Sequence, residues 1–244
     1  LGGSVHSGPP VSGIYPVHLP LQPDEKEGFK LYPLFYKETM SMSLESHVSA
    51  LTKGRSPHPP HKHEEEEILV LLAGEVDIIL PDRISSKGEI PLRLKANQFV
   101  YYPAGFSHTL CTVSEAPANY LMFKWKRNFT PFKPSITFGL YDIMNSNGKH
   151  FSVDGFHPQL VFEGSTKYLQ KLHCHTSTLT AGAGYKPHSD LYSVAIIVLE
   201  GEVETLGRRI KPYGVIFYGA GEPHGMYNPG RVTARYIVFE FHGE

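Results

Sequence analysis

The chain has 244 residues, a formal net charge of −1, 41% apolar residues and 12% aromatic residues. This length and apolar content predict a globular protein with one large β domain or two small ones. The near-zero charge argues against a surface that binds nucleic acid or membrane through bulk electrostatics, and no apolar run approaches the roughly 20 residues of a membrane-spanning helix. Fourteen histidines favour metal or proton chemistry. Two cysteines, Cys111 and Cys174, are too few for a disulfide framework but leave a single bridge open.

The first 30 residues are rich in Gly, Pro and Ser and predict an extended N-terminal arm. The sequence begins at Leu1 without a methionine, which indicates a trimmed start or an added segment. A signal peptide is therefore not assessable, and localisation stays open with the cytoplasm favoured.

Short apolar or alternating runs follow, separated by clusters of Gly, Pro, Asp and Asn. This pattern is typical of an all-β sandwich or barrel. The runs in the first half are residues 31–36, 46–52, 68–72, 76–80, 98–102 and 120–125. Residues 127–165 interrupt the rhythm and predict a linker, with a short helix around residues 138–144. Strand-like runs return at residues 168–180, 195–199, 215–218 and 235–241.

A stretch with two histidines and four glutamates lies immediately before the apolar run 68–72. Alternate side chains of a strand point the same way, so His61, His63 and Glu67 can share one face. Two imidazoles and a carboxylate that converge predict a metal site in need of a further ligand. Glu65 has the same parity as Glu67, so alternation alone does not choose between them. The structural alternative is a solvated, proline-stiffened hairpin.

The second half of the chain repeats the first. Blocks recur in the same order, and the closing strand begins twelve residues after the same histidine in both copies. Self-similarity of this kind indicates two copies of one β module. The paired segments are 46–54 with 174–182, 68–76 with 195–203, 99–108 with 215–224, and 120–123 with 236–239.

These blocks resemble the two motifs of the cupin superfamily. The first motif runs Gly, five residues, His-x-His, three or four residues, Glu, six residues, Gly; the second runs Gly, five residues, Pro-x-Gly-x-x-His, three residues, Asn. Residues 61–74 and 103–108 match these spacings. Gly54 lies one residue too early, and Asn97 and Thr112 stand where the second motif has Gly and Asn. The resemblance implies an all-β fold of two tandem cupin barrels, also called double-stranded β-helices or jelly rolls.

The resemblance also implies a domain division. It runs from an N-terminal arm (1–30) through an N-terminal cupin barrel with the metal site (31–126) and a linker (127–165) to a C-terminal cupin barrel with a degenerate site (166–244).

In the family, both motifs contribute ligands to one metal ion. The ligands that the resemblance implies here are His61, His63, Glu67 and His108. The six-residue interval to Gly74 selects Glu67 over Glu65, and the glutamates at 64–66 are then solvated neighbours. Gly74 and Gly105 are implied to serve turns that exclude a Cβ or need a positive φ. Three further histidines are not family ligands: His58 is expected to cap the loop beside the site, and His47 and His175 are expected in the core or in a cavity wall.

The second repeat departs from the family pattern. His188 and His224 align with the first and last ligands of the first repeat, and Asn228 restores the motif's final Asn. Asp190, however, replaces the second histidine, and Val194 replaces the glutamate. Loss of the glutamate predicts a relic site whose barrel survives for packing and dimerisation. The alternative is a second metal held by His188, Asp190 and His224, a two-His-one-carboxylate set.

A site of three histidines and one glutamate leaves one or two open positions, which indicates chemistry rather than pure structure. The resemblance implies a metal-dependent enzyme acting on a small organic substrate that bears a carboxylate or a hydroxyl, with a dioxygenase as the leading class. The alternatives are a redox-neutral hydrolase or isomerase, and a non-catalytic bicupin that binds a small ligand. One divalent transition metal is expected in the N-terminal barrel, with Fe or Mn favoured over Zn, Ni or Cu.

Strand parity suggests that Tyr101, Met122 and Lys124 line the first cavity as substrate-binding residues. Both faces of the run 68–72 are apolar, so burial on two sides is expected, against the sister repeat or against a second subunit. A homodimer is therefore expected, with the Pro-rich arm as a candidate for wrapping a neighbour.

Overall fold

The computed structural model describes residues 12–83, 91–128, 131–144 and 154–243. These residues form strands, turns and loops and include no helix. The short helix predicted around residues 138–144 is wrong, because β10 (Gly139–Asp142) pairs there with β7 (Gln98–Tyr102). In the described ranges, no helix has the length and apolar character of a membrane span. Cys111 and Cys174 are both free, so they do not form the single bridge that the sequence leaves open.

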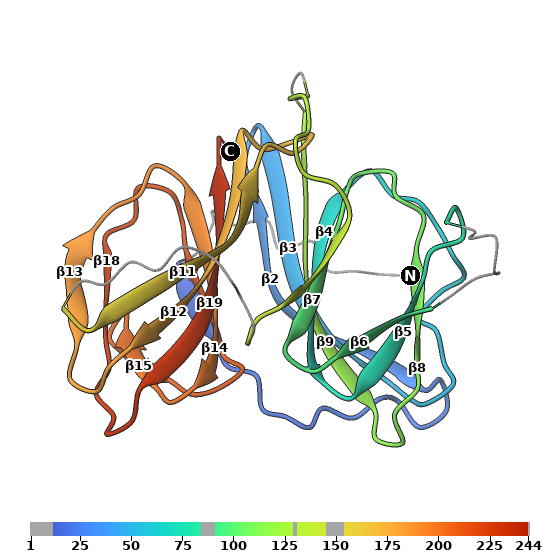
Figure 1. Cartoon of the computed structure of the whole chain (residues 1–244), viewed down its shortest axis with the longest axis horizontal. Coiled ribbons are helices and arrows are strands. Elements are labelled where there is room, and N and C mark those ends of the chain that lie inside the picture. The colour runs from blue at the N-terminus through green and yellow to red at the C-terminus, as the bar shows by residue number, and fades with distance from the viewer. Residues whose placement is uncertain (1–11, 84–90, 129–130, 145–153, 244) are drawn as a thin grey trace.

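Figure 1 shows two β-barrels side by side, the first mainly blue to green and the second mainly orange to red. The remaining strands of the first barrel are β2 (Phe29–Glu38), β3 (Met42–Leu51), β4 (Glu66–Ala73), β5 (Glu75–Ile79), β6 (Leu92–Lys95), β8 (Thr109–Thr112) and β9 (Ala118–Arg127). They form a six-stranded sheet in the order β10-β7-β4-β9-β3-β2 and a three-stranded sheet in the order β6-β5-β8.

The second barrel repeats this plan. Its strands are β1 (Gly13–Tyr15), β11 (Phe156–Gly164), β12 (Lys171–Leu179), β13 (Gly184–His188), β14 (Ser193–Glu200), β15 (Val203–Thr205), β16 (Arg208–Ile210), β17 (Val215–Tyr218), β18 (His224–Tyr227) and β19 (Ala234–His242). The six-stranded sheet has the order β1-β17-β14-β19-β12-β11, and the smaller sheet has the order β13-β18-β15-β16. The predicted all-β fold of paired jelly-roll barrels is confirmed.

Each barrel completes its large sheet with a strand that precedes the other barrel in sequence. β1, which comes before the first barrel, pairs antiparallel with β17 of the second. β10, which comes before the second barrel, pairs antiparallel with β7 of the first. Backbone hydrogen bonds therefore tie the two barrels together in both directions.

The two six-stranded sheets pack against each other through a shared apolar core. Ile68 and Val70 of β4 lie in this core with Phe239 of the second barrel. The ring of Phe239 lies 5.4 Å from that of Phe99, edge to face. Leu69 points the other way, into the interior of the first barrel. The second barrel thus covers the second apolar face of this strand. The homodimer stays a prediction, and this buried face does not support it.

Glu66 is buried at the same interface. Its Oε2 accepts hydrogen bonds from Trp125 Nε1 at 2.5 Å and from the Thr166 hydroxyl at 2.7 Å, and its Oε1 accepts one from the Tyr168 amide at 3.3 Å. Burial raises the pKa of the Glu66 carboxyl, although these hydrogen bonds oppose the effect. The prediction that Glu66 is solvated is wrong, because alternation places it on the face of β4 that the second barrel covers.

Two departures from the cupin motif keep the motif's geometry. Asn97 takes the place of a glycine and adopts φ of 65°, and Tyr213, its equivalent in the second repeat, adopts 70°. Thr112 takes the place of an asparagine, and its hydroxyl donates to the Leu51 carbonyl at 3.2 Å. Asn228 makes the matching bond to the equivalent leucine of its own barrel at 2.8 Å. Different residue types therefore provide the same positive φ and the same hydrogen bond to a leucine carbonyl.

Candidate metal centre

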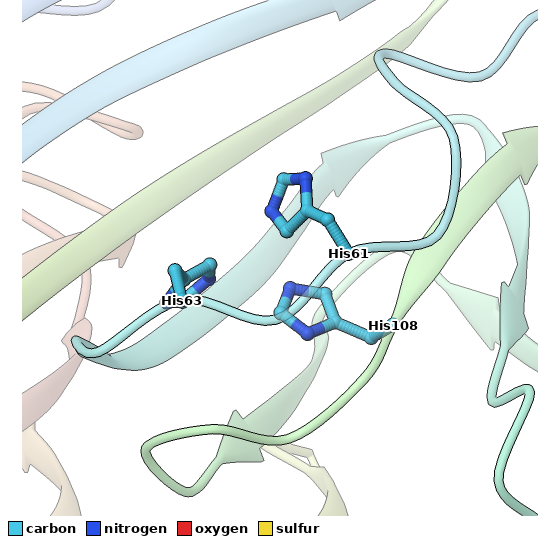
Figure 2. Close-up of side chains that lie close together, drawn as sticks. All are labelled: His61, His63 and His108. Atoms are coloured by element: carbon cyan, nitrogen blue, oxygen red, sulfur yellow. The ribbon is translucent and has the colours of Figure 1, made fainter.

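Three imidazoles meet at the mouth of the first barrel. Figure 2 shows His61 and His63 on the segment before β4 and His108 on the segment after β7, with their rings close together. Their ligand nitrogens all lie within 4.8 Å of one another. The Glu67 Oε2 lies 3.1 Å from His63 Nε2 and 3.6 Å from His108 Nε2. The structure therefore groups the three predicted histidine ligands and places Glu67 beside two of them, while their binding of a metal stays a prediction.

Backbone pairing holds the two histidine segments in place. His61 and His108 form an isolated antiparallel bridge, with amide-to-carbonyl distances of 3.3 and 3.1 Å. The Gly105 amide also donates to the His63 carbonyl at 2.8 Å. Gly105 has φ of 73°, a left-handed conformation that L side chains rarely adopt, as the motif implies. At the far end of β4, Gly74 has φ of 84°, and a Cβ there would lie 2.9 Å from the Ala118 Cα.

Two of the imidazoles are fixed in one tautomer. His63 Nδ1 lies 3.0 Å from the Glu65 carbonyl, and His108 Nδ1 lies 2.8 Å from the Phe106 carbonyl. A carbonyl only accepts hydrogen bonds, so each Nδ1 carries the proton, and in the neutral ring the Nε2 lone pair is left bare. Both Nε2 atoms face the Glu67 carboxylate. Partners on the far side of a histidine ring commonly orient metal ligands in this way.

The carboxylate that these nitrogens face is ionised and incompletely bonded. Burial would raise the pKa of Glu67, but the His108 and His63 rings that face the carboxylate, together with the charge of Lys124, hold that pKa well below its usual range. The Glu67 Oε1 has no hydrogen-bond partner among the residues that the structure describes. Imidazole lone pairs that face one oxygen of a buried carboxylate, whose other oxygen is unbonded, are the kind of donor set that a divalent cation needs.

His61 is also suited to be a ligand. Burial, followed by the neighbouring imidazoles, lowers its pKa to about 4, so the ring is neutral near pH 7. The His58 ring stacks on it with centroids 3.7 Å apart, and His58 Nδ1 donates to the Pro59 carbonyl at 2.9 Å. His58 thus lies in the loop beside the site and packs against a proposed ligand.

A cavity of about 770 Å³ opens beside the four predicted ligands. Met122 and Lys124 lie in its wall, as predicted, and Lys124 Nζ is 3.9 Å from the Glu67 Oε2. His47 also lines it, in the cavity-wall position expected from the sequence. Burial, then the charge of Lys124, lowers the pKa of His47 to about 4. The cavity therefore combines a cation, a neutral imidazole and an apolar wall.

Tyr101 does not line this cavity. It is buried in the core between the barrels, with its ring 6.4 Å from that of Trp125, because it shares strand parity with the outward face of its sheet. The neighbouring Tyr102 faces inward and stacks on the His108 ring at 3.9 Å, nearly parallel. Tyr102 is not among the residues predicted from the sequence. A sequence signal exists, because both repeats carry a tyrosine at this position; in the second repeat, Tyr218 stacks on His224 at 3.8 Å.

The second barrel brings together the three residues of the alternative second site. The Asp190 Oδ2 lies 3.6 Å from His188 Nε2 and 3.3 Å from His224 Nε2. Both rings are anchored through Nδ1, at 3.2 Å from the Lys186 carbonyl and 3.0 Å from the Glu222 carbonyl. They border a smaller cavity of about 310 Å³. The relic interpretation and the second-metal interpretation both stay predictions.

A further cluster was not anticipated. His173, His175 and Glu240 have ligand atoms within 4.8 Å of one another. The sequence signal is a second His-x-His pair, at positions 173 and 175, which lies outside both cupin motifs.

Comparison with known proteins agrees with the fold. Residues 47–124 match the cupin domain family, whereas no curated protein sequence matches the chain. A putative glyoxylate-induced protein from Pseudomonas aeruginosa superposes with a TM-score of 0.70 at 11% identity, over 95% of this chain and 88% of that one. AerE from Microcystis aeruginosa gives 0.60 at 16% identity, over 88% and 99%. Oxalate decarboxylase from Bacillus subtilis, which has Mn(II) centres, gives 0.54 at 11% identity, over 86% and 75%. At these identities the likeness is one of fold.

Proposed function

We propose that the first barrel, in which residues 47–124 match the cupin domain family, is the active site of a metal-dependent enzyme acting on a small organic substrate, with dioxygenase-type chemistry. One observation carries the proposal. Two imidazole lone pairs converge on an ionised, buried carboxylate with an unbonded oxygen, at the edge of a cavity large enough for a small molecule.

The proposed ligands are His61, His63, Glu67 and His108. A divalent metal bound there would supply a Lewis acid and, if it were iron or manganese, a redox centre. Iron and manganese are the favoured metals, and the Mn(II) centres of the structurally similar oxalate decarboxylase support manganese as the first metal to test.

The cavity wall supports a substrate with a carboxylate and a hydrocarbon body. Lys124 places an ammonium 3.9 Å from Glu67, where it would bind a substrate carboxylate. Leu69, Leu110 and Met122 contribute apolar wall that would hold the hydrocarbon part and exclude water. The neutral His47 imidazole would exchange a hydrogen bond with a substrate hydroxyl.

A redox-neutral reaction is the second candidate. The same wall carries Glu45, His47 and Lys124, three groups able to accept or donate protons. Such groups suit a hydrolase, an isomerase or a lyase that moves protons without an external oxidant.

The test is metal analysis of the purified protein followed by oxygen-electrode assays with a panel of small aliphatic and aromatic carboxylates and hydroxy acids. We expect one equivalent of iron or manganese in the first barrel and oxygen uptake that depends on one substrate class. Turnover of that class under strict anaerobiosis would replace the dioxygenase with the redox-neutral enzyme. Absence of bound metal after reconstitution would favour a non-catalytic binding protein.

Two variants locate the function in the first barrel. His61→Ala should remove the metal from this barrel, and full retention there would contradict the ligand assignment. Lys124→Gln should leave the metal content unchanged and raise KM for a carboxylate substrate roughly 10- to 100-fold, because a charge-assisted hydrogen bond is lost. The matched control is Lys126→Gln on the same strand, which pairs with Glu64 and does not line the cavity.

A further inference from the structure

The wall of the second barrel carries a set of ligand-type side chains that belongs to neither cupin motif. We propose that His173, His175 and Glu240 form a binding site for a divalent transition-metal ion of the Zn²⁺ type. The site lies on strands β12 and β19, whereas the family's ligands lie on the hairpin and the facing loop. It does not depend on the function proposed for the first barrel.

The strand register brings the three side chains together. His173 and His175 are two residues apart on β12 and therefore point to the same side of the sheet. Glu240 on β19 is the direct cross-strand partner of His173. His173 Nε2 lies 3.1 Å from His175 Nδ1, and His175 Nδ1 lies 3.9 Å from the Glu240 Oε1. Bonds of about 2.0–2.1 Å to zinc place tetrahedral ligands roughly 3.3 Å apart, close to these spacings.

Each of two ligands is anchored from its far side. His173 Nδ1 donates to the Glu163 Oε2 at 2.8 Å, which leaves the Nε2 lone pair directed toward His175. The Glu240 Oε2 accepts from His242 Nε2 at 2.7 Å, which leaves Oε1 for the site. A carboxylate behind a histidine and a donor behind a carboxylate are the partners that fix ligand orientation in metal centres.

The cluster is accessible from the barrel interior. His175 and Glu240 both line the 310 Å³ cavity of the second barrel. Their side chains are 14% and 16% exposed, and that of His173 is 21% exposed. Water and ions therefore reach the cluster, while its members remain sufficiently packed to keep their geometry. Three protein ligands also leave a coordination position open toward the cavity.

The first barrel shows what the same positions do without this ligand set. Glu45, His47 and Lys124 are the equivalents of the three residues, and Glu45 and Lys124 are likewise direct cross-strand partners. The Lys124 ammonium supplies a permanent positive charge to that wall. The second barrel has a carboxylate at this position, so a bound cation takes the place of the ammonium.

A cluster without metal would be held differently. His175 Nδ1–H would donate to His173 Nε2, and a chain of hydrogen bonds would run from Glu163 through both rings. That arrangement needs a proton on His175 Nδ1, the atom that would bind the metal, so the two states exclude each other. Metal binding therefore distinguishes them.

The experiment measures Zn²⁺ binding by calorimetry in the full chain carrying His61→Ala and His188→Ala, which together disable the two hairpin sites. We expect one equivalent of Zn²⁺ to bind and to raise Tm, because a ligand that binds the folded state stabilises it. Adding Glu240→Lys, which copies the first barrel, should abolish this binding. Adding Glu163→Gln should weaken it roughly 10- to 100-fold without changing the stoichiometry.

The matched control is His157→Ala, which removes an exposed histidine from the neighbouring strand β11 and should leave zinc binding intact. Circular dichroism checks that each variant folds, and His173→Phe replaces Glu240→Lys if the lysine variant does not. The proposal is overturned if the double-alanine protein binds no zinc, or if a folded wall variant still binds one equivalent with unchanged affinity.

Discussion

The two barrels share a strand order but carry their charges in different places. In the first barrel the glutamate lies on the hairpin strand at position 67 and a lysine lies on the wall at position 124. In the second barrel the hairpin strand has Val194 and the wall has Glu240. The jelly roll thus fixes where side chains can meet, and substitution at a few inward positions decides where a cation is favoured.

The cavities differ in the same sense. The first has about 770 Å³ and the second about 310 Å³. The wall of the smaller one includes Tyr185, Tyr192, Tyr218 and Tyr236. The first cavity lies well within the size range of small-molecule sites, whereas the second lies at the lower end of that range.

The largest effect is expected at the hairpin glutamate. Glu67→Gln should take the metal content of the first barrel from about one equivalent to none, because the neutral amide no longer balances the cation. The measurement is metal analysis after dialysis. The protein also carries His188→Ala and Glu240→Lys, so that only the first barrel contributes to the metal content.

The control for this loss is Glu64→Gln in the same background. The Glu64 side chain is 80% exposed and pairs with Lys126 at 3.5 Å. If Glu67→Gln retained as much metal as Glu64→Gln, Glu67 would not be a ligand. The main difference between the barrels would then disappear.

The converse change transplants the glutamate. Val194→Glu places a carboxylate at the position equivalent to Glu67, beside His188 and His224. Without metal it should cost about 3 to 5 kcal/mol of unfolding free energy, because an uncompensated charge enters an apolar position. Manganese or zinc should restore most of this loss, measured by urea unfolding with and without metal.

Val198→Glu is the matched control for the transplant, since Val198 lies in the same barrel core but outside the site. It should be destabilised with no rescue by metal. If metal restored the stability of both variants equally, the hairpin of the second barrel would not provide a specific cation site.

The interface offers a second contrast between equivalent positions. Glu66 accepts bonds from Trp125, Thr166 and Tyr168, whereas its counterpart Ser193 bonds to the Lys37 ammonium at 2.7 Å. Glu66→Ala should cost roughly 2 to 4 kcal/mol, because it leaves a cavity and buried donors without their acceptor. Ser193→Ala should cost less, about 1 to 2 kcal/mol, because the buried Lys37 ammonium loses one acceptor but no large side chain is removed. Chemical denaturation measures both, and a larger cost at Ser193 would reverse the ranking.

The sequence predicted the fold and the neighbourhood of the four proposed ligands, because local patterns specify both. Strand parity places His61, His63 and Glu67 on one face, and the resemblance to the second cupin motif implies that His108 lies opposite them. These are short-range relations between residues of one hairpin or of two adjacent blocks.

What the sequence did not predict depends on how the barrels pack. Alternation alone left both faces of β4 open, and the second barrel's position decided that Glu66 and Tyr101 are buried between the sheets rather than solvated or facing the cavity. The exchange of β1 and β10 likewise depends on contacts between distant segments. The His173–Glu240 pairing needed the register between β12 and β19, which no motif specifies.

The smallest expected effect tests whether the two cavity walls are electrostatically alike. Burial lowers the pKa of His47 to about 4, and burial followed by the charge of His173 does the same for His175. Between the unfolded value of about 6.5 and 4, the unfolded chain binds more protons at these rings, so each contributes stability above pH 6.5 that is lost as the pH falls. In metal-free protein, His47→Gln and His175→Gln should each reduce the loss of stability from pH 7 to pH 5 by about 1 to 2 kcal/mol. Urea unfolding at both pH values measures this, and a reduction in only one variant would show that the equivalent walls hold their histidines in different states.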